Sequence, residues 1–212
     1  GLTECGSVVS LNCPGDDSDD AGRPLDHVQV RVRDGEIIVA ARALLGYLGD
    51  AGLRAADGCP REFSTGDLGH LDESGHLHLS GRSKNLLITS FGRNIAPEWI
   101  EAALLAQPAI AQAVVTGDAR PWLAAVIVPV PGTDAEAIAI SVAAANTTLP
   151  DYARVGAWLQ SPPFSLQNEL ATGNGRPRRS TILARYASGI DALYATANET
   201  DLTREETADV LL

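Results

Sequence analysis

The hydrophobic pattern of this chain changes near residue 85, and that change limits the folds available to it. Before residue 85, apolar and polar residues alternate in short runs, as at Val28, Val30 and Val32. A period of two is typical of half-buried β-strands. After residue 85, short apolar runs alternate with stretches of helical period. Strands that give way to a strand and helix alternation predict an α+β fold.

The first part of the chain predicts two β-hairpins. Asp34-Gly35 separates two alternating runs, and Asp-Gly in that setting is a strong signal for a tight hairpin turn. A second turn is expected around residues 73–75. We therefore expect residues 1–84 to form the β-rich end of a larger domain.

The second part predicts a compact α+β domain over residues 85–188. A buried strand is expected over residues 86–90, followed by a tight loop. Pro97 marks a helix start, where its missing N–H does no harm. Two strands and two helices should follow, the strands over residues 110–117 and 122–130 and the helices over 134–147 and 152–160. Residues 189–212 are expected to be a helical tail, with a capping box at Thr203 and Glu206.

Composition excludes several classes of function. A formal net charge of −11 repels a polyphosphate backbone, so we expect no nucleic-acid partner. No apolar run reaches the roughly 18 residues of a membrane span, so no integral membrane segment is expected. Cys5, Cys13 and Cys59 lack metal-ligand spacing, which predicts free thiols in a cytoplasmic protein.

Other polar residues of the first part do not predict a metal site. The loop over residues 13–24 carries four aspartates but lacks the glycine and terminal glutamate spacing of an EF-hand. His76 and His78 share one face of a strand, with no third ligand in view. We expect a solvated loop and two exposed histidines.

Two segments contain candidate binding residues. In "FSTGDLG", residues 63–69, a glycine-containing turn presents Asp67, whose carboxylate can accept two hydroxyl hydrogen bonds, as from a ribose diol. The alternative is an ordinary Asx-turn between strands. In "TGNGRPRR", residues 172–179, three arginines follow two glycines. That segment is a phosphate-binding loop, a nucleic-acid patch or a solvated turn.

The order of the motifs distinguishes between these alternatives. Six short motifs follow one another along the chain: Thr3-Glu4, Gly35-Glu36, Ser64–Asp67, Gly81-Arg82, Gly92–Glu101 and Asn174–Arg176. The series resembles the adenylate-forming superfamily of acyl-CoA synthetases, peptide-synthetase adenylation domains and firefly luciferase. Within it, "GRSKNLLITSFGRNIAPEWIE" and "LPDYARVGAWLQSPPFS" resemble the long-chain acyl-CoA synthetases. The resemblance covers residues 1 to about 186.

The resemblance implies roles for the nucleotide-binding residues. Glu4 would hold Mg²⁺ and Thr3 would contact the α-phosphate. Asp67 would bind the ribose hydroxyls of ATP or AMP, and Arg82 would reinforce that end of the nucleotide. These roles suit the residue types, because a hard carboxylate binds a hard cation and accepts hydroxyl hydrogen bonds.

The resemblance also implies a mobile lid. Lys84 would be the hinge, and Gly92 and Arg93 would belong to a loop that closes on the pantetheine arm of CoA. Arg176 stands where the family carries a lysine that bridges the substrate carboxylate and the α-phosphate. We expect Arg176 to replace it, although a planar guanidinium differs from a compact ammonium. The alternative is a surface arginine in a protein with weakened adenylation.

The expected activity is that of an AMP-forming acyl-CoA synthetase. The intact protein would activate a carboxylic acid, a fatty acid by its branch of the family, as acyl-AMP and transfer it to CoA, using ATP and Mg²⁺. Because the chain opens at the "GLTE" motif, we expect a fragment that is inactive alone. Two alternatives remain: a module that loads an acyl carrier protein or stops at the acyl-adenylate, and a non-catalytic AMP-binding relic.

Overall fold

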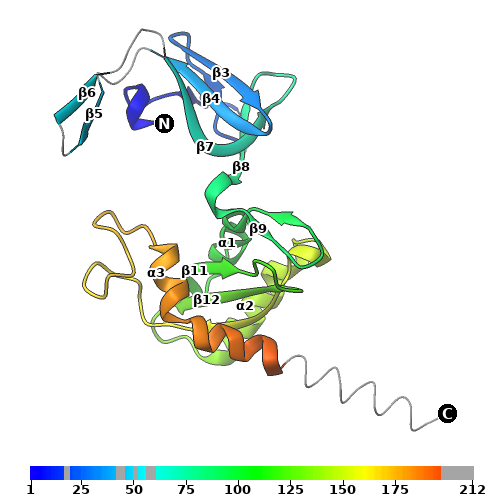
Figure 1. Ribbon diagram of the computed structural model, residues 1–212. Helices are drawn as coiled ribbons and strands as arrows, with labels where there is room; N and C mark the ends of the chain where they lie inside the picture. Colours follow the sequence, from blue (N-terminus) through cyan, green and yellow to red (C-terminus); the bar gives the residue numbers. More distant parts are fainter. Residues whose placement is uncertain (17–19, 42–45, 50–51, 56–60, 197–212) are drawn as a thin grey trace. The chain divides into compact units, whose positions relative to one another are not determined.

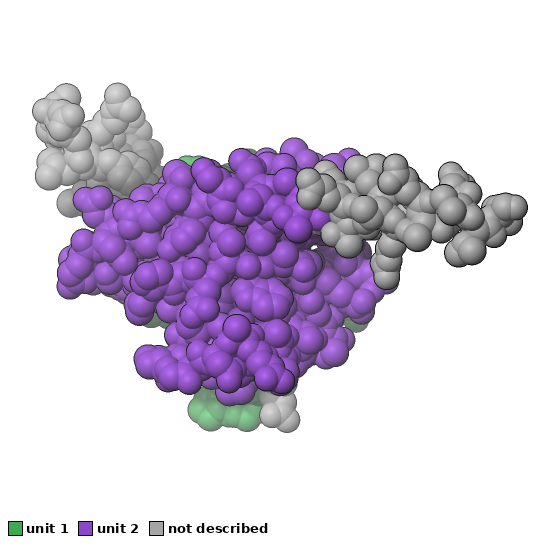
Figure 2. All heavy atoms as spheres, turned by 90° about the horizontal axis from the view of Figure 1, so that it is seen from below, with its two compact units in different colours: residues 1–86 green, residues 87–212 purple. Residues whose placement is uncertain are grey.

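The computed structural model describes residues 1–16, 20–41, 46–49, 52–55 and 61–196, and it divides into two compact units. The first unit is Gly1–Leu86 and the second is Leu87–Leu212, coloured separately in Figure 2. The division falls two residues after the predicted end of the first domain at residue 84. The mixed helix and strand content of the chain confirms the predicted α+β class.

The first unit is built on a four-stranded antiparallel sheet, drawn in blue to green in Figure 1. Its strand order is β3-β4-β7-β8, with the bounds Val28–Arg33, Glu36–Ala41, Arg61–Leu71 and Leu77–Arg82. Both predicted hairpins are confirmed, since β3 pairs with β4 across Asp34-Gly35 and β7 pairs with β8. Asp34 and Gly35 both have positive φ angles, as this turn requires.

Short elements complete the first unit. They are η1 (Thr3–Cys5), β1 (Ser10–Leu11), β2 (Arg23–Pro24), β5 (Gly46–Gly49), β6 (Gly52–Ala55) and η2 (Ser83–Asn85). The core lies on one face of the sheet, where Val28, Val39 and Leu77 pack against Cys5 and Val9 from the N-terminal segment. Cys5 and Cys13 are free thiols, as predicted, while Cys59 lies outside the described residues.

His76 is buried, which corrects the expectation of exposed histidines. Its Nδ1 lies 2.9 Å from Oδ2 of Asp20, and the side chains are 10% and 1% exposed. Asp20 belongs to the loop expected to be solvated, of which residues 17–19 lie outside the described chain. A buried carboxylate requires a partner, so the aspartate and the histidine satisfy each other in the interior. His78 is half-buried, stacks on His70 and pairs with Asp72.

The second unit contains a three-stranded sheet of order β11-β12-β13, with the bounds Ile110–Thr116, Leu123–Pro129 and Val155–Gln160. Strands β11 and β12 are antiparallel, and β12 and β13 are parallel. The other elements are β9 (Leu87–Ile88), β10 (Asn94–Ile95), α1 (Pro97–Leu105), α2 (Ala135–Thr147), η3 (Asp151–Ala153) and α3 (Arg179–Arg185). Residues 187–196 continue as a further helical stretch.

Both faces of this sheet are covered, as Figure 1 shows. Ala125 and Ile127 of β12 face a cluster that includes α1 and α2. Val126 and Val128 face a second cluster, which includes Ile182 of α3. A strand buried on both faces reads as a continuous apolar run, which explains "LAAVIVP".

Two expected elements of the second unit differ from the structure. Residues 152–160 were expected to be helical, but they form η3 and the strand β13. Strand β13 pairs in parallel with β12, and Gly156 lies against Trp122, the residue before β12, where a Cβ would come within 2.8 Å of the indole. The expected buried strand over residues 86–90 is only Leu87–Ile88, and Ile88 is exposed because β9 pairs in a small hairpin with β10 rather than in the sheet.

The predicted tail can be compared over part of its length. Residues 187–196 are helical, which agrees with the start of the expected helix at residue 189. The capping box at Thr203 and Glu206 lies outside the described residues. No helix in the described part of the chain is long and apolar enough to cross a membrane.

Candidate functional site

A β-bulge in β7 presents Asp67. Ile38 of β4 pairs with Ser64 and Glu36 pairs with Leu68, so residues 65–67 face a single residue of the neighbouring strand. Gly66 lies in this bulge with a φ of +72°, in the left-handed region that side chains avoid. Such bulges re-aim side chains next to functional sites. The sequence "STGD" therefore builds a distorted strand segment rather than a simple turn between strands.

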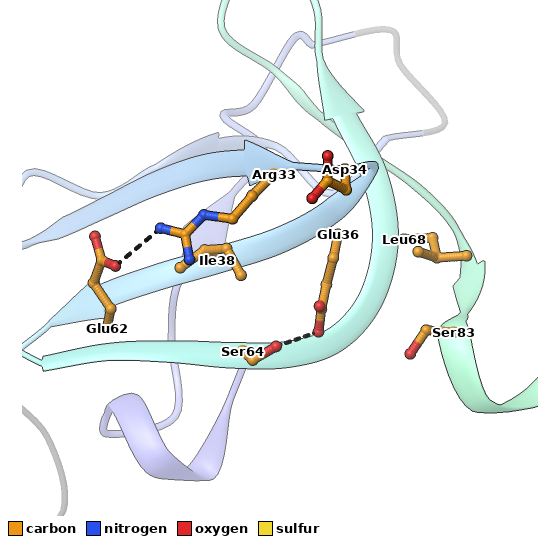
Figure 3. A pocket seen from close by; sticks show the side chains of 8 residues that line it. All are labelled: Arg33, Asp34, Glu36, Ile38, Glu62, Ser64, Leu68 and Ser83. Atoms are coloured by element: carbon orange, nitrogen blue, oxygen red, sulfur yellow. Dashed lines mark hydrogen bonds and ion pairs between the residues drawn. The ribbon is translucent and has the colours of Figure 1, made fainter.

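Glu36 holds the bulge from the neighbouring strand. Its Oε1 accepts a hydrogen bond from the Ser64 hydroxyl at 2.5 Å and another from the Gly66 backbone N–H at 2.9 Å. Figure 3 shows the bond between Glu36 and Ser64. These two bonds, the Ser64 hydroxyl first, lower the pKa of the Glu36 carboxyl below its usual value. The carboxylate is thus ionised at neutral pH.

Thr65 joins the bulge to both strand and site. Its hydroxyl donates to the Ile37 carbonyl at 2.7 Å and accepts from the Asp67 backbone N–H at 3.0 Å. Because one hydroxyl bonds both β4 and the residue two positions further along the chain, it restricts the backbone path from Thr65 to Asp67. The backbone of Asp67 is therefore tied to β4 through Thr65.

Asp67 and Arg82 form an ion pair across β7 and β8. The Arg82 Nε lies 2.6 Å from Asp67 Oδ1, and the residues are register partners. Arg82 also donates to the Thr65 carbonyl at 3.2 Å. The Asp67 side chain is 24% exposed. A carboxylate has about four acceptor positions, so a hydroxyl-bearing ligand can bind while Arg82 stays in place.

A polar pocket of about 480 Å³ lies beside the bulge. Figure 3 shows the side chains that line it from β3, the β3–β4 turn, β4, β7 and η2: Arg33, Asp34, Glu36, Ile38, Glu62, Ser64, Leu68 and Ser83. Arg33 and Glu62 form an ion pair on one wall, at 3.4 Å. The pocket therefore brings the Glu36 and Ser64 side chains to a surface that a ligand can reach.

Thr3, Glu4 and Lys84 occupy short 3₁₀ segments of the first unit. Thr3 is exposed and Glu4 half-buried in η1, and Lys84 is exposed in η2. Among the described residues, no group of three or more potential ligands could hold a metal ion. Mg²⁺ bound to a nucleotide needs only one or two protein carboxylates because phosphates and water supply the rest. Glu4 alone is compatible with that role.

The loop between β9 and β10 contains Gly92 and Arg93, both exposed. Thr89 closes it through backbone bonds with Arg93 at 3.0 Å and Gly92 at 2.8 Å. Gly92 has a φ of +73°. The Arg93 guanidinium lies over the Tyr152 ring, 5.4 Å from its centroid. The loop is thus short and constrained, with one cation held on an aromatic face.

Arg176 extends from a tight turn in the second unit. Thr172 closes this turn, accepting from the Arg176 backbone N–H at 3.1 Å. The Arg176 side chain is exposed, and within the described chain it forms no hydrogen bond or ion pair. A guanidinium held on an ordered turn and left unpaired is available to bind an anion.

Arg179, three residues on, is anchored instead. Its Nη2 lies 2.5 Å from Glu101 Oε1, and its Nη1 donates to the Val115 carbonyl at 2.7 Å. Glu101 also accepts from the Val115 N–H at 2.7 Å. Burial raises the pKa of the Glu101 carboxyl above its usual value, even though Arg179 opposes the shift. The pair ties the start of α3 to α1 and β11.

The structure brings some predicted site residues together. Asp67 and Arg82 are in contact in the first unit, whereas Arg93 and Arg176 belong to separate loops of the second. Sequence reasoning gave no site role to Glu36 and did not pair Glu101 with Arg179. Glu36 did stand in a motif of the ordered series, but its bonds to residues 64–66 depend on strand pairing.

The fold and this site define the class of protein. Residues 84–198 match the AMP-binding enzyme C-terminal domain family, and the chain belongs to that family. The predicted relationship to adenylate-forming enzymes is confirmed.

Individual relatives extend the comparison. The long-chain-fatty-acid–CoA ligase FadD15 of Mycobacterium tuberculosis is 39% identical over 108 residues, which cover 50% of this chain and 18% of that protein. A long-chain-fatty-acid–[acyl-carrier-protein] ligase of Arabidopsis thaliana is 29% identical over 157 residues, covering 63% and 21%. The o-succinylbenzoate CoA synthetase of Bacillus subtilis, solved with AMP and with ATP and magnesium, matches with a TM-score of 0.67 at 25% identity, covering 85% of this chain and 39% of that one.

The chain is much shorter than these relatives. It spans about a fifth of the length of the curated ligases that it matches.

Proposed function

We propose that this chain forms part of an ATP-dependent, AMP-forming acid–thiol ligase that makes acyl-CoA. The observation that carries the proposal is the bulge that presents Asp67, with its carboxylate paired to Arg82 at 2.6 Å. A partly exposed carboxylate on a rigid, hydrogen-bonded segment can accept both hydroxyls of a ribose. Membership of the AMP-binding family supports the same assignment.

The proposed reaction has two steps. A carboxylate oxygen of the acid attacks the α-phosphorus of ATP, the bond to pyrophosphate breaks, and an acyl-adenylate forms. The CoA thiolate then attacks the acyl carbonyl, the bond to phosphate breaks, and AMP leaves. Asp67 and Arg82 orient the nucleotide, Thr3 contacts its α-phosphate, and Glu4 holds Mg²⁺. The ion neutralises phosphate charge when bound.

Arg176 is the residue proposed to stabilise the first transition state. Negative charge accumulates where the substrate carboxylate meets the α-phosphate, and a preorganised cation stabilises it. Arg176 is the exposed, unpaired cation of the turn over residues 172–176, among the residues that the structure describes. The planar guanidinium can bond both anions at once.

The second step, the transfer to CoA, is assigned to the loop between β9 and β10. Gly92 and Arg93 are proposed to bind the pantetheine arm of CoA, and Lys84 is proposed as the hinge between the two steps. The first unit ends at Leu86, two residues beyond Lys84, which is compatible with a hinge there. Domain motions of this kind commonly gate enzymes.

The substrate is proposed to be a fatty acid, since the FadD15 ligase is a long-chain-fatty-acid–CoA ligase by name. Transfer to a carrier protein is the second candidate, favoured by similarity to the acyl-carrier-protein ligase of Arabidopsis thaliana. The cytoplasm stays the predicted location.

The test is acid-dependent exchange of radiolabelled pyrophosphate into ATP by the intact protein. Hexadecanoate, dodecanoate and 2-succinylbenzoate are compared, and exchange with at least one is expected. CoA and an acyl carrier protein thiol are then offered to the loaded enzyme, and CoA is expected to be acylated faster. Absence of exchange with every acid, together with retained AMP binding, would identify a non-catalytic relic instead.

A further inference from the structure

The position of Asp67 depends on contacts made from outside its own strand. Residues 65–67 bulge from β7, so they have no register partners on β4. Gly66 adopts a left-handed conformation, which glycine tolerates but does not enforce. Without further anchors, such a segment has several backbone conformations of similar energy, and Asp67 would move with it.

Glu36 supplies the charged anchor. One carboxylate oxygen accepts from both the Ser64 hydroxyl and the Gly66 N–H, at 2.5 and 2.9 Å. Those donors lie on the N-terminal side of Asp67, and the Thr65 hydroxyl, between them, accepts from the Asp67 N–H. Hydrogen bonds to an ionised acceptor are about twice as strong as neutral ones. Glu36 therefore fixes the residues that determine where the Asp67 carboxylate points.

We infer that Glu36 is a positioning residue for sugar recognition, acting through the bulge on Asp67. The inference rests on the proposed function, since it takes Asp67 to bind the ribose hydroxyls. Glu36 has no contact with the sugar in this scheme. By fixing the bulge, Glu36 holds the Asp67 carboxylate where it can accept hydrogen bonds from both ribose hydroxyls. A nucleotide that lacks the 2′-hydroxyl should then bind more weakly.

The inference predicts a specific signature in nucleotide binding. Isothermal titration of the intact protein with AMP and with 2′-deoxy-AMP gives the ratio of the two affinities. A hydroxyl bonded to a fixed carboxylate is worth about a factor of ten or more. The wild-type protein should prefer AMP by at least about that factor. Glu36→Ala should reduce the preference to within about threefold, mostly by weakening AMP binding.

Matched variants separate positioning from general damage. Glu62 lines the same pocket, but its carboxylate pairs with Arg31 and Arg33 and has no bond to the bulge. Glu62→Ala should therefore keep the wild-type ratio of the AMP and 2′-deoxy-AMP affinities. Glu36→Gln retains an acceptor oxygen without the charge and should give an intermediate ratio. If Glu36→Ala is too unstable for titration, Glu36→Gln is used to test the inference in its place.

Each outcome decides between the claims. A Glu36→Ala or Glu36→Gln protein that is folded and retains the full wild-type preference overturns the inference. Equal weakening of AMP and 2′-deoxy-AMP also overturns it, because that is the signature of a merely structural role. A wild-type protein that exchanges pyrophosphate but does not discriminate between the two nucleotides overturns the inference and leaves the ligase proposal standing. A wild-type protein with neither binding nor exchange overturns both.

Discussion

Arg179 and Glu101, 78 residues apart in sequence, form an ion pair at 2.5 Å in which the two side chains are only 19% and 13% exposed. The pair connects the start of α3, which follows the turn carrying Arg176, to α1, which follows the loop carrying Gly92. One buried contact thus supports the elements next to both loops that we propose to act in catalysis.

Arg179→Ala should lower the free energy of unfolding of the second unit by about 3 kcal/mol, because it leaves the buried Glu101 carboxylate without its partner. Trp99, Trp122 and Trp158 all lie in this unit, so urea denaturation followed by tryptophan fluorescence reports on it directly. Arg178→Ala is the matched control, since Arg178 is exposed, and it should cost less than about 0.5 kcal/mol. Equal effects of the two variants would contradict a structural role for the pair.

The cost of Arg179→Ala should depend on pH. Burial raises the pKa of Glu101 above 4.5 in the folded protein, so its contribution to stability is greatest below that pH and falls as the pH rises. Removing Arg179 raises the pKa further. The variant should therefore be most destabilised at about pH 8 and less destabilised at about pH 5, because a lower pH favours the protonated Glu101 carboxyl, which needs no cationic partner. Denaturation at both pH values tests this, and a cost that is constant or grows towards acid argues against it.

Asp72 should contribute to stability against acid in the first unit. Hydrogen bonds from the His76 N–H and then the His78 ring lower its pKa from 3.8 to about 2. A lowered pKa gives stability that is complete above 3.8 and disappears as the pH falls through about 2. Asp72→Asn should be less stable than wild type at neutral pH, with the difference vanishing near that lower value. Far-UV circular dichroism of urea unfolding measures it, and Glu73→Gln, at an exposed neighbour, should show no such trend.

Arg176→Ala in the intact protein should reduce acid-dependent ATP–pyrophosphate exchange by about 100-fold, since one preorganised charge at a transition state is worth that much. Acylation of CoA from a preformed acyl-adenylate should change little, because Arg176 is assigned to the first step only. Arg178→Ala provides the control, with exchange near the wild-type rate. Equal exchange by Arg176→Ala and wild type would refute the assignment. Arg176→Lys tests whether a compact cation serves equally well.

Lys84→Pro should separate the two half-reactions. Proline fixes φ and restricts the residue before it, so it should hold one arrangement of the proposed hinge. One half-reaction should survive and the other should fall by at least about tenfold. Pyrophosphate exchange and CoA acylation from acyl-adenylate are measured separately in the intact protein. If both survive, or if both are lost in a protein that still melts as wild type does, the hinge lies elsewhere.

Local sequence signals predicted several of the regular elements. Asp34-Gly35 lies between β3 and β4, and Pro97 begins α1, because each residue type restricts its own backbone dihedrals. The alternation of apolar residues found both hairpins of the first sheet. The six ordered motifs indicated the family before any contact was known. Whether their residues have the implied roles stays a prediction.

Other features could not be predicted locally. Residues 152–160 form a strand rather than a helix because β12 offers an edge for parallel pairing and Trp122 requires a glycine beside it. His76 is buried because Asp20, 56 residues away in sequence, lies against it. The expectation of an exposed His76 was wrong for this reason, whereas residues 13–16 of the loop are exposed, as expected.

The sequence by itself determined the class of fold, the family and the residue types available for binding a nucleotide, since these follow from short-range patterns and from motif order. Tertiary structure decided which of those residues support one another. Glu36 reaches the Ser64–Gly66 segment through strand pairing, and Arg179 reaches Glu101 through helix packing. Contacts between distant residues depend on how the whole chain buries its apolar surface and satisfies its polar groups, and no local pattern encodes that.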